Sequence, residues 1–197
     1  MPDTCGTNSS GTEGCEMIPA STYLGRAASL AESIVDELKN RKKMIVAAES
    51  CTAGLASDFI ARIPGASNVL WGSFVTYTVD AKIKMLGLPE ELIQKYGAVS
   101  RPVALAMAEG ALKKSGAWWA FSITGLAGPG GDGDTPVGTI WIGISGREDE
   151  RADYKQSIGC YRSEARVFFF SGSRNEIREA AAAAAMEELL ARIHCPL

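Results

Sequence analysis

Short apolar runs alternate with helical patterns along most of the chain, and this alternation limits the folds open to it. Residues 44–50 (MIVAAES) form an apolar run that is too short for a helix and is typical of a buried strand. Similar runs, rich in β-branched and aromatic residues, recur downstream. The predicted strands cover residues 44–50, 69–78, 117–124, 137–145 and 153–161. Strands that alternate with helices predict a layered α/β domain.

Apolar spacing and capping residues place the helices. Ser100 is expected to cap one helix, and Ser173 with Glu176 forms an S-x-x-E capping box before a long Ala-rich helix. No helical pattern separates the strands at 117–124 and 137–145, which flank a glycine-rich loop. We therefore expect a mixed, mostly parallel sheet. The first predicted helix ends near residue 40. The others cover residues 51–65, 79–87, 89–97, 100–114 and 173–193.

Residues 1–20 are rich in Gly, Ser, Thr and Asn, and we expect a flexible tail because they offer little apolar surface to bury. Residues 21–197 are expected to form a single domain. The chain is 46% hydrophobic and 22% charged, which is ordinary for a soluble globular protein. A net charge of −3 lacks the excess of basic residues that is typical of nucleic-acid-binding proteins, so no nucleic-acid partner is expected. No apolar run approaches the roughly 18 residues of a membrane span, so no membrane partner is expected.

The five cysteines are odd in number and show no paired C-x-x-C spacing. This usage is typical of reduced thiols in a cytosolic protein. The amino terminus has neither the basic start nor the apolar block of a secretory signal. Both features predict a cytoplasmic location.

The only histidine, His194, lies three residues from the carboxy terminus. Zinc sites that need several histidines of one chain are therefore excluded, and we expect neither a metal nor a cofactor. A Ser-His-Asp triad would depend on a residue near a frayed end. If the chain is a hydrolase, its base is expected to be another side chain.

The segment AAESCTAG (47–54) places two possible nucleophiles, Ser50 and Cys51, where a buried strand turns into a helix. Ligands collect at the carboxyl ends of strands in α/β folds, and free N–H groups at a helix start can hold a phosphate or an oxyanion. The alternative is an ordinary helix cap beside a buried cysteine.

Tyr77, Lys82 and Lys84 follow the next predicted strand. A lysine that is partly desolvated in a pocket can lose its proton and serve as the base for a serine. Most helical lysines are solvated instead, and position alone does not separate Lys82 from Lys84.

The loop TGLAGPGGDGDTPVG (124–138) is rich in glycine, and successive backbone N–H groups in such loops can bind anions. It matches neither a dinucleotide-binding nor a P-loop pattern. A plain connection between strands is the alternative. Near the last helix start, Arg174 and Arg178 are possible phosphate partners.

Taken together, these segments resemble the CinA carboxy-terminal domain family, whose stand-alone members are nicotinamide mononucleotide deamidases. The resemblance runs from about residue 24 to 193. It implies a three-layer α/β/α fold and hydrolysis of the substrate's carboxamide to nicotinate mononucleotide and ammonia. The matching segments are, in order, AAESCTAG (47–54), IPGAS (63–67), GSFVTYTVDAK (72–82), LG (86–87), YGAVS (96–100), MAEGAL (107–112), ITGLAGPGG (123–131), PVGTIW (136–141) and FSGSR (170–174).

The family's E-S-C-T motif places its serine at Ser50, and its Y-x-x-x-A-K motif places the lysine base at Lys82 and the tyrosine at Tyr77. By the same resemblance, Ser50 attacks the carboxamide, Lys82 accepts and returns the proton, and Tyr77 relays it or holds the lysine. Backbone N–H groups of residues 51–54 would stabilise the oxyanion. The expected substrate-binding residues are Cys51, Thr52, Thr124, Gly125 and Arg174.

The chain departs from the family pattern in two places around the expected nucleotide site. Ser173 stands where an aspartate is usual, and Thr135, in a slightly short glycine loop, stands where many members have lysine. Three alternatives stay open: Cys51 as the nucleophile, a silent nucleotide-binding or partner-binding module, and an amidase for another nucleotide. The family and an exposed Ala-rich last helix suggest a homo-oligomer.

Overall fold

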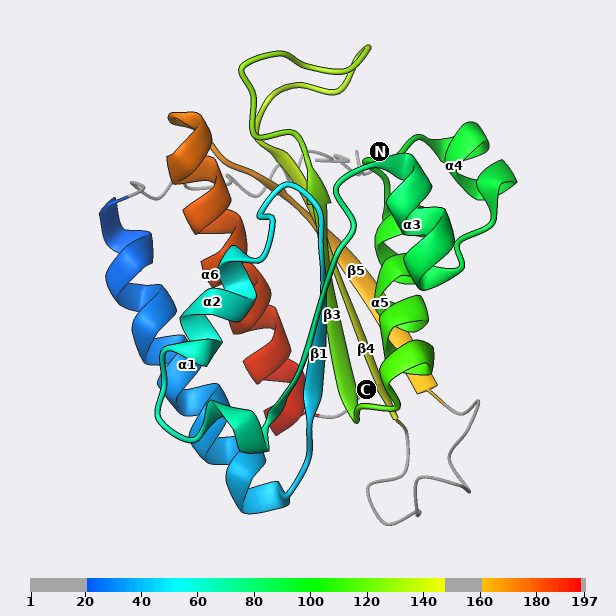
Figure 1. The fold of residues 1–197 in the computed structure, drawn as a ribbon. Coiled ribbons are helices and arrows are strands. Elements are labelled where there is room, and N and C mark those ends of the chain that lie inside the picture. The colour runs from blue at the N-terminus through cyan, green and yellow to red at the C-terminus, as the bar shows by residue number, and fades with distance from the viewer. Residues whose placement is uncertain (1–20, 148–160, 196–197) are drawn as a thin grey trace, which may run out of the picture.

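The computed structural model describes residues 21–147 and 161–195. Helices flank a central sheet on both sides (Figure 1). Within the described ranges, no helix is long and apolar enough to cross a membrane. The predicted tail, residues 1–20, lies outside these ranges, so the proposed domain boundary stays a prediction.

The sheet has five strands in the order β2-β1-β3-β4-β5 within the described residues. β1 pairs in parallel with β2 and with β3, whereas β4 is antiparallel to both β3 and β5. The mixed sheet is confirmed, but its pairings divide evenly instead of being mostly parallel. The strands are β1 (Ile45–Glu49), β2 (Leu70–Val75), β3 (Trp119–Gly125), β4 (Thr139–Arg147) and β5 (Tyr161–Phe169).

The glycine-rich loop explains the antiparallel half of the sheet. It carries the chain from β3 back to β4 without a crossover helix, and direct connections of this kind produce antiparallel neighbours. Leu126 N–H donates to Thr139 O at 3.0 Å, and Gly138 N–H donates to Leu126 O at 2.7 Å, which closes the base of the loop.

The three-layer α/β/α architecture is confirmed. Helices α1, α2 and α6 cover one face of the sheet, and α3, α4 and α5 cover the other (Figure 1). β1 supplies both cores because its side chains alternate: Ile45 and Ala47 belong to the first, Val46 and Ala48 to the second. The helices are α1 (Ser21–Arg41), α2 (Leu55–Ala61), α3 (Val79–Leu86), α4 (Glu90–Tyr96), α5 (Arg101–Ser115) and α6 (Arg174–His194).

The predicted capping box of α6 is confirmed: the Ser173 side chain accepts from Glu176 N–H, and the Glu176 carboxylate accepts from Ser173 N–H. The expectation that the Ala-rich part of this helix is exposed is wrong. The alanines at 180–185 are all buried in the core beside α1. Small side chains allow the two helices to approach closely, so this stripe supports the fold and gives no surface for a homo-oligomer.

Other boundaries differ from the sequence-based predictions. The last strand is β5 at Tyr161–Phe169, whereas the predicted strand at 153–161 falls almost wholly outside the described residues. Ser100 occupies the N-cap of α5, but its hydroxyl donates to Gly97 O instead of accepting from the helix. The helix predicted from residue 51 begins at Leu55, because residues 51–54 form a tight turn.

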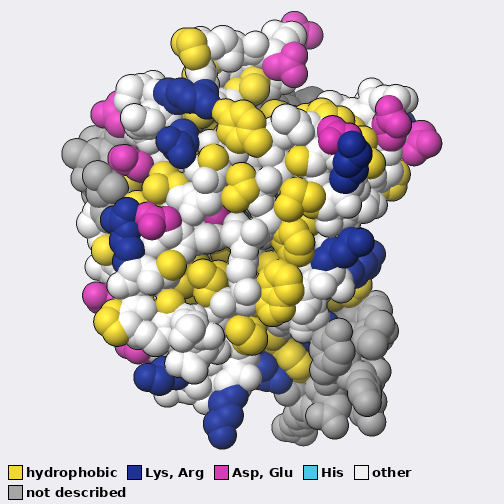
Figure 2. All heavy atoms as spheres, in the orientation of Figure 1, with side chains coloured by type: hydrophobic (Ala, Val, Ile, Leu, Met, Phe, Trp, Pro, Cys, Tyr) yellow, Lys and Arg dark blue, Asp and Glu magenta, His cyan; other side chains and the backbone are white. Residues whose placement is uncertain are grey.

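The edge strand β2 leaves apolar side chains in solvent. Trp71 and Val75 are both exposed there, and Trp71 stacks on Phe74. Figure 2 shows hydrophobic side chains gathered near the middle of the face seen in Figure 1. The expected homo-oligomer stays a prediction.

Candidate active site

The carboxyl ends of the three parallel strands meet at one edge of the sheet, where α/β folds bind ligands. Ser50 directly follows β1, which lies between β2 and β3, and its N–H donates to Ile123 O on β3 at 2.9 Å. On the other side, Thr76 N–H donates to Glu49 O at 2.8 Å. The hydrogen bonds of the sheet therefore fix the backbone around Ser50 between strands β2 and β3.

Lys82 reaches Ser50 from helix α3, which Thr78 caps by accepting from Ala81 N–H. The Lys82 side chain is buried, with 2% of its surface exposed. Its Nζ donates to Ser50 Oγ at 2.9 Å and to Thr76 O at 2.8 Å. Lys84, two residues on, points to solvent and pairs with Asp80. The structure thus separates the two lysines that position alone could not.

Burial changes the protonation of both groups beside Ser50. It lowers the pKa of Lys82 to about 8, against a smaller opposing effect of the Cys51 thiol on that pKa. At pH 7, about a tenth of such amines are neutral, compared with fewer than about one in a thousand at the ordinary lysine pKa. Burial also raises the pKa of Cys51 to about 11, so its thiol stays protonated and weakly nucleophilic.

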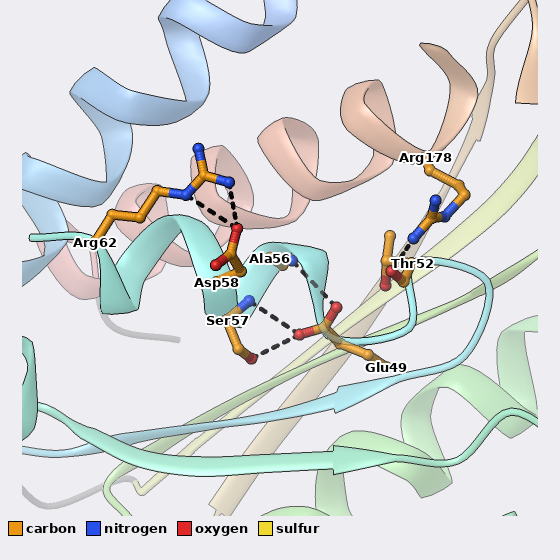
Figure 3. Close-up of polar contacts among 7 residues, drawn as sticks. All are labelled: Glu49, Thr52, Ala56, Ser57, Asp58, Arg62 and Arg178. Atoms are coloured by element: carbon orange, nitrogen blue, oxygen red, sulfur yellow. Dashed lines mark hydrogen bonds and ion pairs between the residues drawn. The ribbon is translucent and has the colours of Figure 1, made fainter. Parts of the chain in front are cut away.

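Sequence reasoning missed the role of Glu49, which is wholly buried at the end of β1. Figure 3 shows its carboxylate facing the start of α2. It accepts from the N–H groups of Gly54, Ala56 and Ser57 at 2.9 to 3.1 Å, and from Ser57 Oγ at 2.6 Å. An acidic residue inside an otherwise apolar strand, just before small helix-start residues, was the available signal.

The turn after Ser50 has an uncommon backbone. Ala53 has a φ of 52° and Gly54 a φ of 94°, so two successive residues are left-handed. Ala53 N–H donates to Ser50 O at 3.0 Å, which closes the turn. Among the described residues, no carbonyl or carboxylate accepts from the N–H of Cys51 or of Thr52. Cys51 lines the cavity beside Ser50, whereas Thr52 is fully buried, so of these two N–H groups that of Cys51 is the candidate to stabilise an oxyanion.

A cavity of about 250 Å³ opens beside the Ser50–Lys82 pair. Most of the predicted site residues line it. Thr52 does not: the whole residue is buried, so it presents no surface to a ligand in the cavity. The predicted residues in the lining are Ser50, Cys51, Tyr77, Lys82, Thr124, Gly125 and Arg174.

Two predicted residues on β3 have structural partners. Thr124 Oγ1 donates to Ala98 O at 2.8 Å and holds the segment before α5 against the cavity wall. Gly125 lies so close to β4 that a Cβ there would stand 2.6 Å from Thr139 O. Close strand packing therefore accounts for this glycine, beside any contact with a ligand.

Tyr77 and Arg174 meet at the cavity mouth. Arg174 Nη2 donates to Tyr77 Oη at 2.6 Å, and Nη1 donates to Gly128 O. Tyr77 is 52% exposed, and its recorded hydrogen-bond partner is Arg174 and not Lys82. The geometry therefore favours a role in orienting the arginine over a proton relay.

Arg178 was predicted as a second phosphate partner, but it lies elsewhere. Its Nε donates to Cys51 O at 3.1 Å and its Nη2 to Thr52 O at 2.9 Å. Figure 3 shows the guanidinium against the turn that carries Thr52. Arg178 is absent from the cavity lining, so the phosphate interpretation is wrong for this residue.

The comparisons agree with this architecture. A family model described as the CinA C-terminal domain matches residues 27–193. The chain belongs to this family. Within the described ranges, no group of three or more His, Cys, Asp or Glu side chains is placed to hold a metal ion.

Relatives and solved structures carry family names without a stated activity. A CinA-like protein of Akkermansia muciniphila is 48% identical over 124 residues, which covers 62% of this chain and 30% of that protein. A CinA-like protein of Chlorobaculum tepidum is 38% identical over 172 residues, covering 87% of this chain and 39% of that protein. The chain thus spans roughly a third of the length of these relatives.

Among solved structures, the competence/damage inducible protein CihA of Agrobacterium tumefaciens has a TM-score of 0.75 at 38% identity. The match covers 85% of this chain and 95% of that chain. A solved chain can therefore consist almost entirely of this domain.

Proposed function

We propose that the protein is a nicotinamide-nucleotide amidohydrolase, which converts nicotinamide mononucleotide and water to nicotinate mononucleotide and ammonia in pyridine nucleotide salvage. The observation that carries the proposal is the buried contact of 2.9 Å between Lys82 Nζ and Ser50 Oγ at the wall of the cavity. A serine paired with a desolvated amine is an activated nucleophile that needs no histidine. Family membership supports the same reaction class.

In the proposed mechanism, Ser50 Oγ bonds to the carboxamide carbon while its proton passes to neutral Lys82. The tetrahedral intermediate then collapses, the carbon–nitrogen bond breaks, and Lys82 returns the proton to the leaving ammonia. Water, deprotonated by the same lysine, attacks the acyl-enzyme and releases the carboxylate product and Ser50. A base with a pKa near the working pH suits both directions of this proton transfer.

The substrate's charged end would lie at the cavity mouth. Arg174 presents its guanidinium there, and two of its five N–H groups serve Tyr77 and Gly128. The remaining donors can bind a ribose phosphate, with backbone groups near Thr124 and Gly125 completing the subsite. Tyr77 then acts by fixing the arginine. The cavity of about 250 Å³ suits the nicotinamide end of the nucleotide, while the phosphate stays near solvent.

Ammonia release is the test. We expect it from nicotinamide mononucleotide, with much weaker release from nicotinamide, which lacks the phosphate, and from NAD, which adds a second nucleotide. If ammonia release depends on Ser50 but is fastest with a different nucleotide, the proposed substrate is wrong and the proposed reaction at Ser50 stands.

A silent binding module is the remaining alternative. It predicts tight nucleotide binding by calorimetry with no ammonia released. Cys51 is the weaker nucleophile because burial keeps it protonated, and activity that survives thiol alkylation would dismiss it.

A further inference from the structure

We propose that the Ser50–Lys82 pair is also a carboxylate-binding site, through which the carboxylate product of the reaction, nicotinate mononucleotide, inhibits the protein. This inference rests on the proposed function only for the identity of the nucleotide. Binding of a carboxylate as such depends on the charge, the burial and the hydrogen bonds of Lys82.

Lys82 is a buried side chain with an unused hydrogen-bond donor when it is protonated. An ammonium has three N–H donors, and two of those on Nζ serve Ser50 Oγ at 2.9 Å and Thr76 O at 2.8 Å. Among the described residues, no acceptor is recorded for the third. Lys82 is 2% exposed and lines the cavity, so an acceptor bound in the cavity can take this donor.

No acidic side chain within the described ranges forms an ion pair with Lys82. Asp80, on the same helix, pairs with Lys84 at 2.8 Å. The carboxylate of Glu49 faces the start of α2 and accepts from the helix N–H groups there (Figure 3). A buried ammonium without a counter-ion is costly, and an anion in the cavity would reduce this cost. Its attraction to Lys82 is stronger than to an exposed lysine, because little water screens the pair.

The other titratable side chains of the cavity lining leave this role to Lys82. Arg174 lies at the mouth, where the phosphate is proposed to bind, and its guanidinium donates to the hydroxyl of Tyr77. Asp132 is an acid and repels a carboxylate. The Cys51 thiol stays neutral, because burial raises its pKa to about 11. A carboxylate next to the nucleophile therefore depends on Lys82 for its counter-ion.

Hydrolysis of a carboxamide leaves a carboxylate where Lys82 can hold it. The reacting carbon is bonded to Ser50 Oγ in the proposed acyl-enzyme, and Lys82 Nζ lies 2.9 Å from that oxygen. The product oxygens are released next to the amine, and with the ammonium they form a charge-assisted hydrogen bond. The carboxamide of the substrate is neutral and gains no such bond. The carboxylate nucleotide should therefore bind more tightly than the amide whenever Lys82 is protonated.

This dependence on protonation makes the inhibition sensitive to pH. Burial lowers the pKa of Lys82 to about 8, and only the ammonium attracts a carboxylate. Affinity for the carboxylate nucleotide should be complete well below pH 8 and fall about tenfold between pH 7 and pH 9. A phosphate monoester is largely ionised throughout this range, so the phosphate does not cause the change. The neutral amine is the base of the reaction, and the ammonium holds the product.

Calorimetry with nicotinate mononucleotide, which the proposed reaction does not consume, tests the site in the full chain. Lys82→Met keeps a long side chain without its charge, and we expect it to weaken binding at pH 7 about 10- to 100-fold and to remove the pH dependence. Lys84→Met, on the same helix, should change the affinity less than about twofold. Melting curves confirm that both variants fold. Parent-like affinity in folded Lys82→Met, or an affinity of the parent that does not fall between pH 7 and pH 9, would overturn the inference.

Ser50→Ala allows the amide and the carboxylate to be compared without turnover. In this variant Lys82 keeps its amine, so nicotinate mononucleotide should bind less tightly at pH 9 than at pH 7, whereas nicotinamide mononucleotide should not. This comparison stays decisive if Lys82→Met does not fold. Equal weakening of both ligands at pH 9 would assign the effect to the phosphate subsite and contradict the proposal.

Ammonia release separates this inference from the proposed function. If nicotinamide mononucleotide releases no ammonia but nicotinate mononucleotide binds in a way that needs Lys82, the proposed function fails and the carboxylate site stands. If ammonia is released and the affinity for nicotinate mononucleotide is the same in the parent and in Lys82→Met, the inference fails alone. In an active protein, the inhibition constant of nicotinate mononucleotide should be about ten times higher at pH 9 than at pH 7. Absence of binding to the parent at both pH values also overturns the inference.

Discussion

The turn after β1 and the loop after β3 border the same cavity but are built in opposite ways. In the turn, Glu49 and Arg178 use a buried carboxylate and a guanidinium to fix the backbone. The loop at 129–137 is mostly exposed, and the backbone hydrogen bonds described for it join Asp132 to Thr135 and Thr139 N–H to Pro136 O. The turn that carries the proposed nucleophile is thus held by side chains as well as by backbone, whereas the bonds described within the exposed loop are backbone contacts.

The largest expected effect separates the two lysines of α3. Lys82→Met removes the amine at 2.9 Å from Ser50 Oγ while keeping a long side chain, and we expect ammonia release to fall by at least about 10²- to 10⁴-fold. Lys84→Met removes a solvated ion pair and should leave kcat unchanged. Steady-state kinetics at pH 8 checks both, with Ser50→Ala as the background. Equal activity of the two variants would contradict the assignment of Lys82 as the base.

Next in size is the cost of removing the buried acceptor. Glu49→Ala leaves three N–H groups and the hydroxyls of Ser57 and Ser73 without this acceptor, and we expect a loss of about 3 kcal/mol in the free energy of unfolding. Asp132→Ala, in the exposed loop, should change it by less than about 0.5 kcal/mol. Urea denaturation measures both. Similar losses would show that the turn and the loop are equally constrained.

Substituting a glycine in this region should cost more stability near the strands than at the tip of the loop. In Gly125→Ala, the new methyl group meets Thr139 O at 2.6 Å, and overpacking of this kind costs about 1–3 kcal/mol. Gly130 has open space around it, so Gly130→Ala should be close to neutral. Thermal melting of the two variants compares them directly. A larger loss in Gly130→Ala would mean that the loop tip is packed.

The smallest effect is expected where the chain departs from its family. Ser173→Asp keeps an N-cap for α6, since both residues accept from the helix start, so stability should change by less than about 0.5 kcal/mol. We expect kcat to stay constant and KM for nicotinamide mononucleotide to change only a few-fold, because residue 173 adjoins Arg174 at the mouth. A large change in kcat would place this position in the chemistry.

The sequence predicted much of the fold because periodicity and capping are local signals. Most strand and helix positions and the capping box of Ser173 followed from short segments. The pairing of Ser50 with Lys82 came instead from the resemblance to the family, because position alone did not separate Lys82 from Lys84. The roles of Glu49 and Arg178 followed from neither. Glu49 looks like a polar strand end until the turn folds back over it, and Arg178 meets a turn that lies more than 120 residues away. The buried alanines of α6 were misjudged because small residues fit both surfaces and cores.

The central claim is that neutral Lys82 accepts the proton of Ser50, and the pH dependence of kcat/KM for ammonia release tests it most directly. Burial lowers the pKa of Lys82 to about 8, and only the unprotonated amine is a base, so activity should rise with pH. We predict a tenfold gain per pH unit below about 8 and a plateau above it. His194→Ala should keep this profile. A rate that is flat between pH 6 and 10, or that falls as pH rises through 8, would contradict the account.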